Sequence, residues 1–304
     1  MLGVLAYRLG MMPLIIVAVV TILFIIFQFI PGDEATLVAG ATATQREIRQ
    51  VRHQLGLDRP ILVQYGMRLG ELAHADLGYS PTFRGNPLPR ILERVPATLL
   101  LTASAITLAV VAGVPAGLFA AFFVNGWPDF AISAAVVGLL AVPNFWLGMM
   151  LIALFAVQLH WLPSIGLNGP LTLIMPTVAL AARLIALIGR ITRGVVIEEM
   201  RRDYVRTARA KGLSDRVTLV RHVLPNALIP IVTVIGLQTG YLLGGSVVVE
   251  RLFDWPGIGD LLLTAVGLRD YTLVQGITII FVVGFLLINL AVELLYRLIN
   301  PRLR

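Results

Sequence analysis

Six long apolar stretches, separated by polar segments, constrain the fold of this chain more than any other feature. A helix of about 20 residues is long enough to cross the roughly 30 Å hydrocarbon core of a bilayer. Because lipid offers the backbone no hydrogen bonds, apolar segments of this length cross a membrane as α-helices. The sequence therefore predicts an all-α, polytopic membrane protein with six transmembrane helices, at residues 9–30, 97–123, 130–157, 173–197, 227–249 and 273–298.

Composition agrees with this class. The chain is 58% hydrophobic and 13% charged, with a mean hydropathy of +0.87, which excludes an ordinary soluble domain. It has no cysteine, so disulfides and thiolate metal sites are excluded. The net charge of +7 comes from arginines between apolar runs, where they set orientation and meet headgroups. The expected partner of these charges is membrane lipid, not nucleic acid.

The polar segments divide the chain into three regions. Residues 1–30 form the first transmembrane helix, residues 31–95 an extracytoplasmic helical region, and residues 96–304 a five-helix core that contains a polar loop at 198–225. A cleaved signal peptide is the rival interpretation of the first region. Its apolar run is longer than a usual signal core, and Ala41-Thr42-Ala43 lies far beyond it, which favours an uncleaved span ended by Pro31-Gly32.

The external region carries two helix signals. Thr44 with Glu47 three residues later is a capping box, which predicts a helix to about Leu55. A second helix is expected from Ile61 to His74. The region is expected to serve either as a structural cap or as a docking surface for a soluble binding protein.

The loop at 198–225 is strongly basic and its pattern predicts two helices. Nine of the chain's 24 basic residues lie in it or just before it. Asp203 is expected to cap a first helix that ends at Gly212, and Asp215 a second helix that Pro225 interrupts. A solvated loop that only sets topology remains the alternative.

The same loop resembles the EAA loop of ABC importer permeases. That pattern has Glu-Ala-Ala, then Gly four positions later, then Ile, and finally Leu-Pro. The matching residues are Ala208, Gly212, Leu224 and Pro225. Arg206, Thr207 and His222 stand where the pattern has Glu, Ala and Ile.

Further motifs resemble the peptide/nickel permeases, the branch that transports dipeptides, oligopeptides, glutathione, nickel or metal chelates. They are DYVRTARAKGLS with RHVLPNALIP, QLGLDRPILVQYG with ADLGYS, VPNFWLG, LHWLP and ERLFDWPGIGDLLLTAVGLRDY. The resemblance covers nearly the whole chain. It implies an ABC type I importer permease fold, a second homologous permease subunit, two ATPase subunits and an extracytoplasmic substrate-binding protein. The loop would then be the coupling helix that docks on an ATPase.

The residues that the resemblance and the loop charges assign to coupling are Asp203, Arg206, Thr207, Ala208, Lys211, Gly212, Leu224 and Pro225. Lys211 is the chain's single lysine, and no phosphate-binding loop precedes it. The chain is therefore expected to have no enzyme activity and no cofactor of its own, with ATP and Mg²⁺ held by the partner ATPases.

Polar residues inside the expected spans are candidates for the translocation pathway. They are Asn144, Arg183, Gln238 and Ser246. Asn144 follows Pro143 in the middle of a span, and either lines the pathway or serves in helix packing. Arg183 either lines a wet cavity or extends to the headgroups.

Glycines mark expected helix contacts. Gly113 and Gly117, on either side of Pro115, permit a kink or a close contact in the second span. In the fifth span, four glycines spaced about four apart are expected to share one tightly packed face: Gly236, Gly240, Gly244 and Gly245.

Orientation follows from the charges. The short, arginine-rich loop at 190–221 predicts the cytoplasmic side, and Arg297, Arg302 and Arg304 agree. Six spans then place both termini in the cytoplasm of a multi-pass protein of the bacterial inner membrane.

Two other function classes are weighed. A secondary transporter needs carboxylates within its spans, and the acidic candidates, Glu250 and Glu293, lie near span ends. An intramembrane enzyme needs a catalytic motif, and none of the four histidines stands in one. Ion coupling and enzymatic function are both disfavoured, and a peptide importer subunit is preferred over a nickel or metal-chelate permease.

Overall fold

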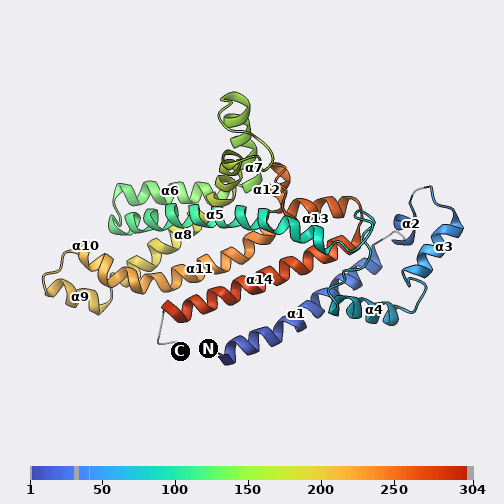
Figure 1. Cartoon of the computed structure of the whole chain (residues 1–304). Helices are drawn as coiled ribbons and strands as arrows, with labels where there is room; N and C mark the ends of the chain where they lie inside the picture. The colour runs from blue at the N-terminus through green and yellow to red at the C-terminus, as the bar shows by residue number, and fades with distance from the viewer. Residues whose placement is uncertain (1, 31–33, 41, 300–304) are drawn as a thin grey trace. The chain divides into compact units, whose positions relative to one another are not determined.

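The computed structural model describes residues 2–30, 34–40 and 42–299, and these contain helices but no strand (Figure 1). The helices of the first part are α1 (Leu2–Phe29), α2 (Glu34–Ala39), α3 (Gln45–Gln54), α4 (Ile61–Ala73) and α5 (Leu88–Phe122). The middle part holds α6 (Trp127–Ala141), α7 (Asn144–Leu151), the π-helix η1 (Ile152–Gln158) and α8 (Pro170–Glu199). The last part holds α9 (Asp203–Ala210), α10 (Asp215–Thr218), the π-helix η2 (Leu219–Val223), α11 (Leu224–Gly245), α12 (Val247–Leu252), α13 (Ile258–Gly267) and α14 (Tyr271–Ile299).

The prediction of an all-helical protein with six spans is confirmed. Among the described residues, five helices are long and apolar enough to cross a membrane, and α6 with the segment Asn144–Gln158 makes a sixth candidate, bent by 98°. The break falls at Pro143, as expected. Proline lacks a backbone N–H and disfavours helical geometry in the residue before it, here Val142 with ψ of 123°.

The chain forms two compact units. The first comprises Met1–Pro96 with Gly257–Leu286, and the second Ala97–Pro256 with Leu287–Arg304. Both α5 and α14 run from one unit into the other.

In the first unit, the expected capping box begins α3. The Thr44 hydroxyl accepts the Glu47 backbone N–H at 3.4 Å, and the Glu47 carboxylate accepts the Thr44 backbone N–H at 2.6 Å. The backbone donor and then the hydroxyl of Thr44 lower the pKa of Glu47. Both short helices expected here are confirmed to within a residue or so, as α3 and α4. The end of the first span at Pro31-Gly32 falls outside the described residues.

A buried carboxylate that no sequence motif marked holds the first unit together. Asp270 is almost fully buried and accepts the hydroxyl of Ser80 at 2.5 Å and the backbone N–H of Thr82 at 3.1 Å. Its other oxygen accepts the backbone N–H of Leu273 at 2.9 Å, which caps the start of α14. One side chain therefore joins segments 190 residues apart.

In the second unit, glycines bring α5 and α8 into close contact. A Cβ on Gly113 would lie 2.8 Å from the carbonyl oxygen of Ile185, and one on Gly117 would lie 2.4 Å from that of Gly189. The close contact expected of Gly113 and Gly117 is confirmed, because only hydrogen fits between these backbones.

The expected glycine face of the fifth span is confirmed at Gly236 and wrong at Gly244 and Gly245, while Gly240 is buried. A Cβ on Gly236 would lie 2.2 Å from the side chain of Val292, so this glycine does pack closely. Gly244 and Gly245 have nothing within 4 Å of such a Cβ. They occupy the end of α11, where Ser246 separates it from α12, so their spacing does not continue one packed face.

A charge pair also lies in the second unit, between α6 and α8. The Arg193 guanidinium donates to both carboxylate oxygens of Asp129, one of them at 2.7 Å. Asp129 is buried, and its carboxylate also accepts the backbone N–H of Asn125 at 3.0 Å. This pair fixes the N-terminal end of α6 against α8.

Candidate functional site

The loop at 198–225 forms the two short helices that its sequence predicts. Figure 1 shows α9 and α10 beside each other, and in the chain they lie between the end of α8 and the start of α11. All four helices belong to the second unit. The loop is therefore a structured projection rather than a flexible connection.

Two apolar residues anchor α9. Val205 and Ala208, three positions apart and so on one helix face, are both buried. Val205 belongs to an apolar cluster that includes Val196 of α8, Val223 of η2 and Ala227 of α11. A movement of α9 would therefore displace the ends of the two long helices α8 and α11.

Gly212 ends α9 in the conformation expected. Its φ is +81°, in the left-handed region that favours glycine. The N–H of Gly212 donates to the carbonyl of Arg209 at 2.9 Å, and that of Leu213 to the carbonyl of Ala208 at 3.2 Å. These two bonds form a Schellman motif.

The expected N-caps of both helices are wrong by one residue. The N-cap positions are Arg202 and Ser214, and neither makes a side-chain capping bond. Asp203 and Asp215 are the first residues of α9 and α10. A carboxylate in the first turn is still favoured there, because the N-terminal end of a helix carries partial positive charge.

The expected interruption at Pro225 is also wrong. The chain continues from α10 through η2 into α11, and Asp215–Gly245 forms one long span candidate. Proline interrupts a helix because it lacks an N–H and crowds the carbonyl four residues earlier. The π-helix at Leu219–Val223 widens the turn just before Pro225, and Pro225 falls in the first turn of α11.

The outer face of the loop offers charged and apolar side chains. Arg206, Thr207 and Lys211 are exposed, and Arg206 keeps only a long 3.7 Å contact with Asp203. Val217 and Val220 are exposed as well, and neither was expected at this surface. The sequence pattern that could have identified them is a pair of apolar residues three positions apart within a polar segment. Of the two remaining candidates, Leu224 is half-buried and Pro225 is exposed.

Two polar contacts stiffen this face. Arg209 donates to Asp215 at 2.8 Å and so joins α9 to α10. Tyr204 donates to the Glu199 carboxylate at 2.7 Å. Burial raises the pKa of the Tyr204 phenol, and the Glu199 hydrogen bond raises it further, so this phenol stays a neutral donor near pH 7.

Three of the four candidate pathway residues lie on different helices and Ser246 lies between α11 and α12, and no hydrogen bond joins any two of the four within the described part of the chain. Asn144 begins α7 and is half-buried. Arg183 is exposed on α8, although its neighbours Ala182 and Leu184 are buried. Gln238 is half-buried on α11.

Ser246 lies in a buried network. Its hydroxyl donates to the Glu250 carboxylate at 2.9 Å, and the hydroxyl of Thr98 donates to the same oxygen at 2.9 Å. Ser246, Thr98 and Glu250 are fully buried. Trp255 closes this region, because its indole N–H donates to the Ala97 carbonyl at 2.9 Å.

Comparison with known proteins gives relatives along the full chain. Residues 1–102 match the family "Binding-prot-dependent transport system membrane comp, N-term". Residues 113–304 match "Binding-protein-dependent transport system inner membrane component". The chain is 43% identical over 297 residues to the glutathione transport system permease protein GsiC of Escherichia coli O6:H1, covering 97% of this chain and 96% of that one. The protein of the same name in strain K12 is 42% identical over the same coverage.

Solved structures agree on the fold. An inward-facing conformation of the MetNI methionine ABC transporter matches 70% of this chain and 98% of its own, with a TM-score of 0.60 and 21% identity. An amino acid ABC transporter with histidines matches with a TM-score of 0.53 over 69% of this chain and 94% of its own, at 21% identity. Together with the apolar spans and the ordered basic loop, these matches place the chain in the family of binding-protein-dependent inner-membrane components, as a permease subunit of an ABC importer.

Proposed function

We propose that this permease subunit imports small peptides, with glutathione-like tripeptides included, across the bacterial inner membrane. The observation that carries the proposal is the anchored helix α9, whose buried side ties it to α8 and α11 and whose outer side presents exposed charges. The high similarity to glutathione permeases along the whole chain supports the substrate class.

The energy for import comes from partner chains. A second homologous permease subunit completes the pathway, two ATPase subunits bind ATP and Mg²⁺, and a binding protein delivers substrate from outside. ATP drives the cycle because it binds the two conformations of the assembly unequally. The proposed coupling surface comprises Asp203, Arg206, Thr207, Lys211, Gly212, Leu224 and Pro225, with the buried Ala208 anchoring α9 behind it. Val217 and Val220, exposed on the same loop, extend it.

The proposed orientation places the coupling surface and both termini in the cytoplasm, and residues 31–95 outside. The arginine-rich loop supports this orientation by the positive-inside rule. Arg302 and Arg304, which agree with it by sequence, lie outside the described residues, and the side chain of Arg297 is not described.

For the pathway we propose Asn144, Arg183 and Gln238, because Arg183 is exposed and the other two residues are half-buried. Ser246 is buried against Glu250, so it reaches the pathway only in another conformation of the subunit.

The coupling surface is tested at Gly212. Gly212→Val forces a branched side chain into a left-handed φ, at a cost of about 1–3 kcal/mol. A Cβ there meets nothing within 4 Å, so only the backbone is strained. We expect the reconstituted complex to lose most of the ATPase stimulation that loaded binding protein produces, while membrane insertion persists.

Two further variants control this experiment. Gly212→Asn should recover most of the stimulation, because asparagine tolerates a positive φ. Gly194→Val changes an exposed glycine of α8 with nothing within 4 Å of its Cβ position, and should have little effect. Full stimulation of the Gly212→Val complex would contradict the coupling role.

The pathway proposal is tested at Arg183. If its guanidinium attracts a substrate carboxylate, Arg183→Gln should slow import of a tripeptide with a free C-terminus several-fold more than import of its C-terminally amidated form. Uptake of the two labelled peptides into proteoliposomes measures the difference. Arg190→Gln, at another exposed arginine of α8, is the matched control. Equal slowing of both peptides would assign Arg183 to the headgroup region instead.

A further inference from the structure

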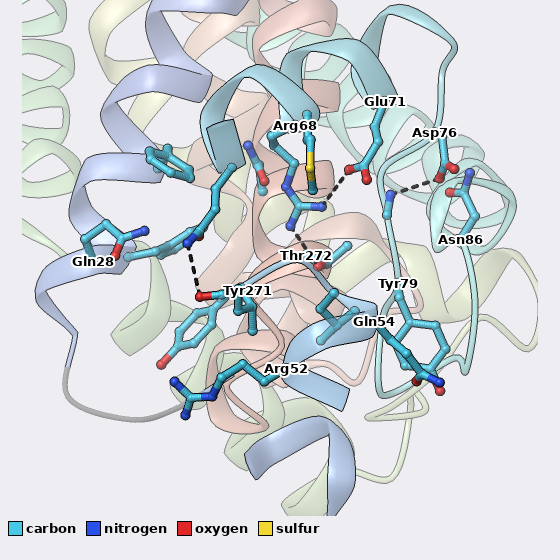
Figure 2. A pocket seen from close by; sticks show the side chains of 18 of the residues that line it. Gln28, Arg52, Gln54, Arg68, Glu71, Asp76, Tyr79, Asn86, Tyr271 and Thr272 are labelled. Carbon is cyan, nitrogen blue, oxygen red and sulfur yellow. Dashed lines mark hydrogen bonds and ion pairs between the residues drawn. The ribbon is translucent and has the colours of Figure 1, made fainter. Parts of the chain in front are cut away.

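A polar cavity of about 590 Å³ lies within the first compact unit (Figure 2). Its walls come from the last turns of α1, the end of α3, the helix α4, the loop at 76–86 and the first turns of α14. Small-ligand sites in proteins have volumes of about 300–1,000 Å³. The proposed coupling and pathway residues do not line this cavity.

One buried side chain in the cavity wall has no partner. Gln275, on α14, is 6% exposed, and no hydrogen bond to its carboxamide occurs within the described residues. Leaving a buried polar group unsatisfied costs roughly 1–3 kcal/mol, so buried carboxamides are normally paired. The phenol oxygen of Tyr271, another residue of the wall, is also buried and unpaired among the described residues. Of the two groups, only the Gln275 carboxamide is open to a ligand, because the Tyr271 phenol oxygen is fully enclosed.

Carboxamides are unusually frequent in this wall. Five segments contribute one each: Gln28, Gln54, Gln64, Asn86 and Gln275. Gln64 and Asn86 already bond to the backbone, Gln64 to the Arg59 carbonyl at 2.8 Å and Asn86 to the Leu88 N–H at 2.9 Å. A carboxamide places a donor beside an acceptor, which is the complement of a peptide group.

The wall carries charges of both signs, from Arg52, Arg68, Glu71 and Asp76. Figure 2 shows Arg68 directed at Glu71 and Thr272. Its guanidinium donates to Glu71 at 3.2 Å, to Thr272 at 3.1 Å and to the Leu77 carbonyl at 3.4 Å. Because Arg68 already donates to a carboxylate, a hydroxyl and a carbonyl, its guanidinium joins α4 to α14 and to the loop at 76–86. The aromatic rings of Phe24, Phe27 and Tyr79 supply apolar surface beside the carboxamides.

We propose that this cavity binds a short peptide, with the Gln275 carboxamide paired to a peptide group of the ligand. The site goes beyond the proposed transport function, because its lining includes none of the proposed coupling or pathway residues. It would hold a peptide on the permease whether or not a binding protein is present.

The test measures ligand binding to the complete importer complex in nanodiscs, without ATP and without binding protein. Trialanine is the probe and phosphoethanolamine the headgroup comparison, both followed by saturation-transfer NMR. We expect trialanine to bind, and Gln275→Leu to weaken binding at least tenfold. Gln45→Leu, which changes an exposed carboxamide of α3 outside the cavity, should leave binding unchanged.

A second variant covers the case in which Gln275→Leu disturbs folding. Tyr79→Ala removes a ring that is 40% exposed at the wall, and should weaken trialanine binding several-fold with no loss of folded complex. Absence of trialanine binding, equal binding by all variants, or binding of phosphoethanolamine alone would overturn the proposal. Transport measured separately in proteoliposomes, with ATP and binding protein, distinguishes this failure from a failure of the proposed function.

Discussion

Gly117→Val should prevent the second unit from folding, with little or no monodisperse permease recovered from the membrane. The Cβ of any residue at this position would lie 2.4 Å from the carbonyl oxygen of Gly189 and 2.6 Å from the Cβ of Thr192. A backbone oxygen moves only if α8 moves, and α8 is held along its length by buried residues. Overpacking costs about 1–3 kcal/mol where a side chain gives way, and more where only backbone faces it.

Fluorescence-detected size-exclusion chromatography of the assembled complex measures this effect. Gly117→Ala should already lower the yield and the apparent melting temperature. Gly138→Ala is the matched control, because nothing lies within 4 Å of a Cβ on this glycine of α6. A Gly117→Ala complex as stable as the Gly138→Ala complex would show that α5 and α8 do not pack as described.

The second large effect is expected at the buried charge pair. Asp129→Ala leaves the Arg193 guanidinium without its carboxylate partner between α6 and α8. Breaking a buried ion pair costs about 3–5 kcal/mol, and the cost here should fall below that range because the Arg193 side chain is 32% exposed. We expect the apparent melting temperature of the complex to fall clearly.

A double-mutant cycle separates the pair from its surroundings. Asp129→Asn with Arg193→Gln removes both charges, and should be more stable than either single variant because no unpaired charge remains. Arg202→Gln provides the control, since Arg202 and Glu198 form an exposed pair at 3.2 Å that is worth about 0–1 kcal/mol. Additive losses at Asp129 and Arg193 would contradict a direct interaction.

Features set by neighbours along the chain were predictable. The length of each apolar run determined the number of spans, and Pro143 determined where one of them bends. Thr44 and Glu47 lie within one helical turn, so their capping box was visible in the sequence. Gly212 was identified as a helix end because glycine accepts a left-handed φ at little cost.

Other local predictions failed because a neighbouring element changed the outcome. Pro225 does interrupt an ideal α-helix, but the π-helix before it removes the conflict. Gly244 continues the four-residue spacing of Gly236 and Gly240, yet it lies with Gly245 at the end of α11, where nothing is within 4 Å of a Cβ on either glycine. In both cases the residue type was interpreted correctly and its surroundings were not.

The sequence by itself determined the class of the protein, its helical spans and the ordered basic loop, because these depend on hydrophobicity and on interactions within a few residues. Only the tertiary structure paired Asp129 with Arg193 and Ser80 with Asp270, and only it gathered carboxamides from five segments around one cavity. The residues of the first pair lie 64 positions apart in the chain, and those of the second pair lie 190 positions apart. Each is an ordinary polar residue along the chain, and its partner is chosen by how the helices pack, which no local pattern in one sequence specifies.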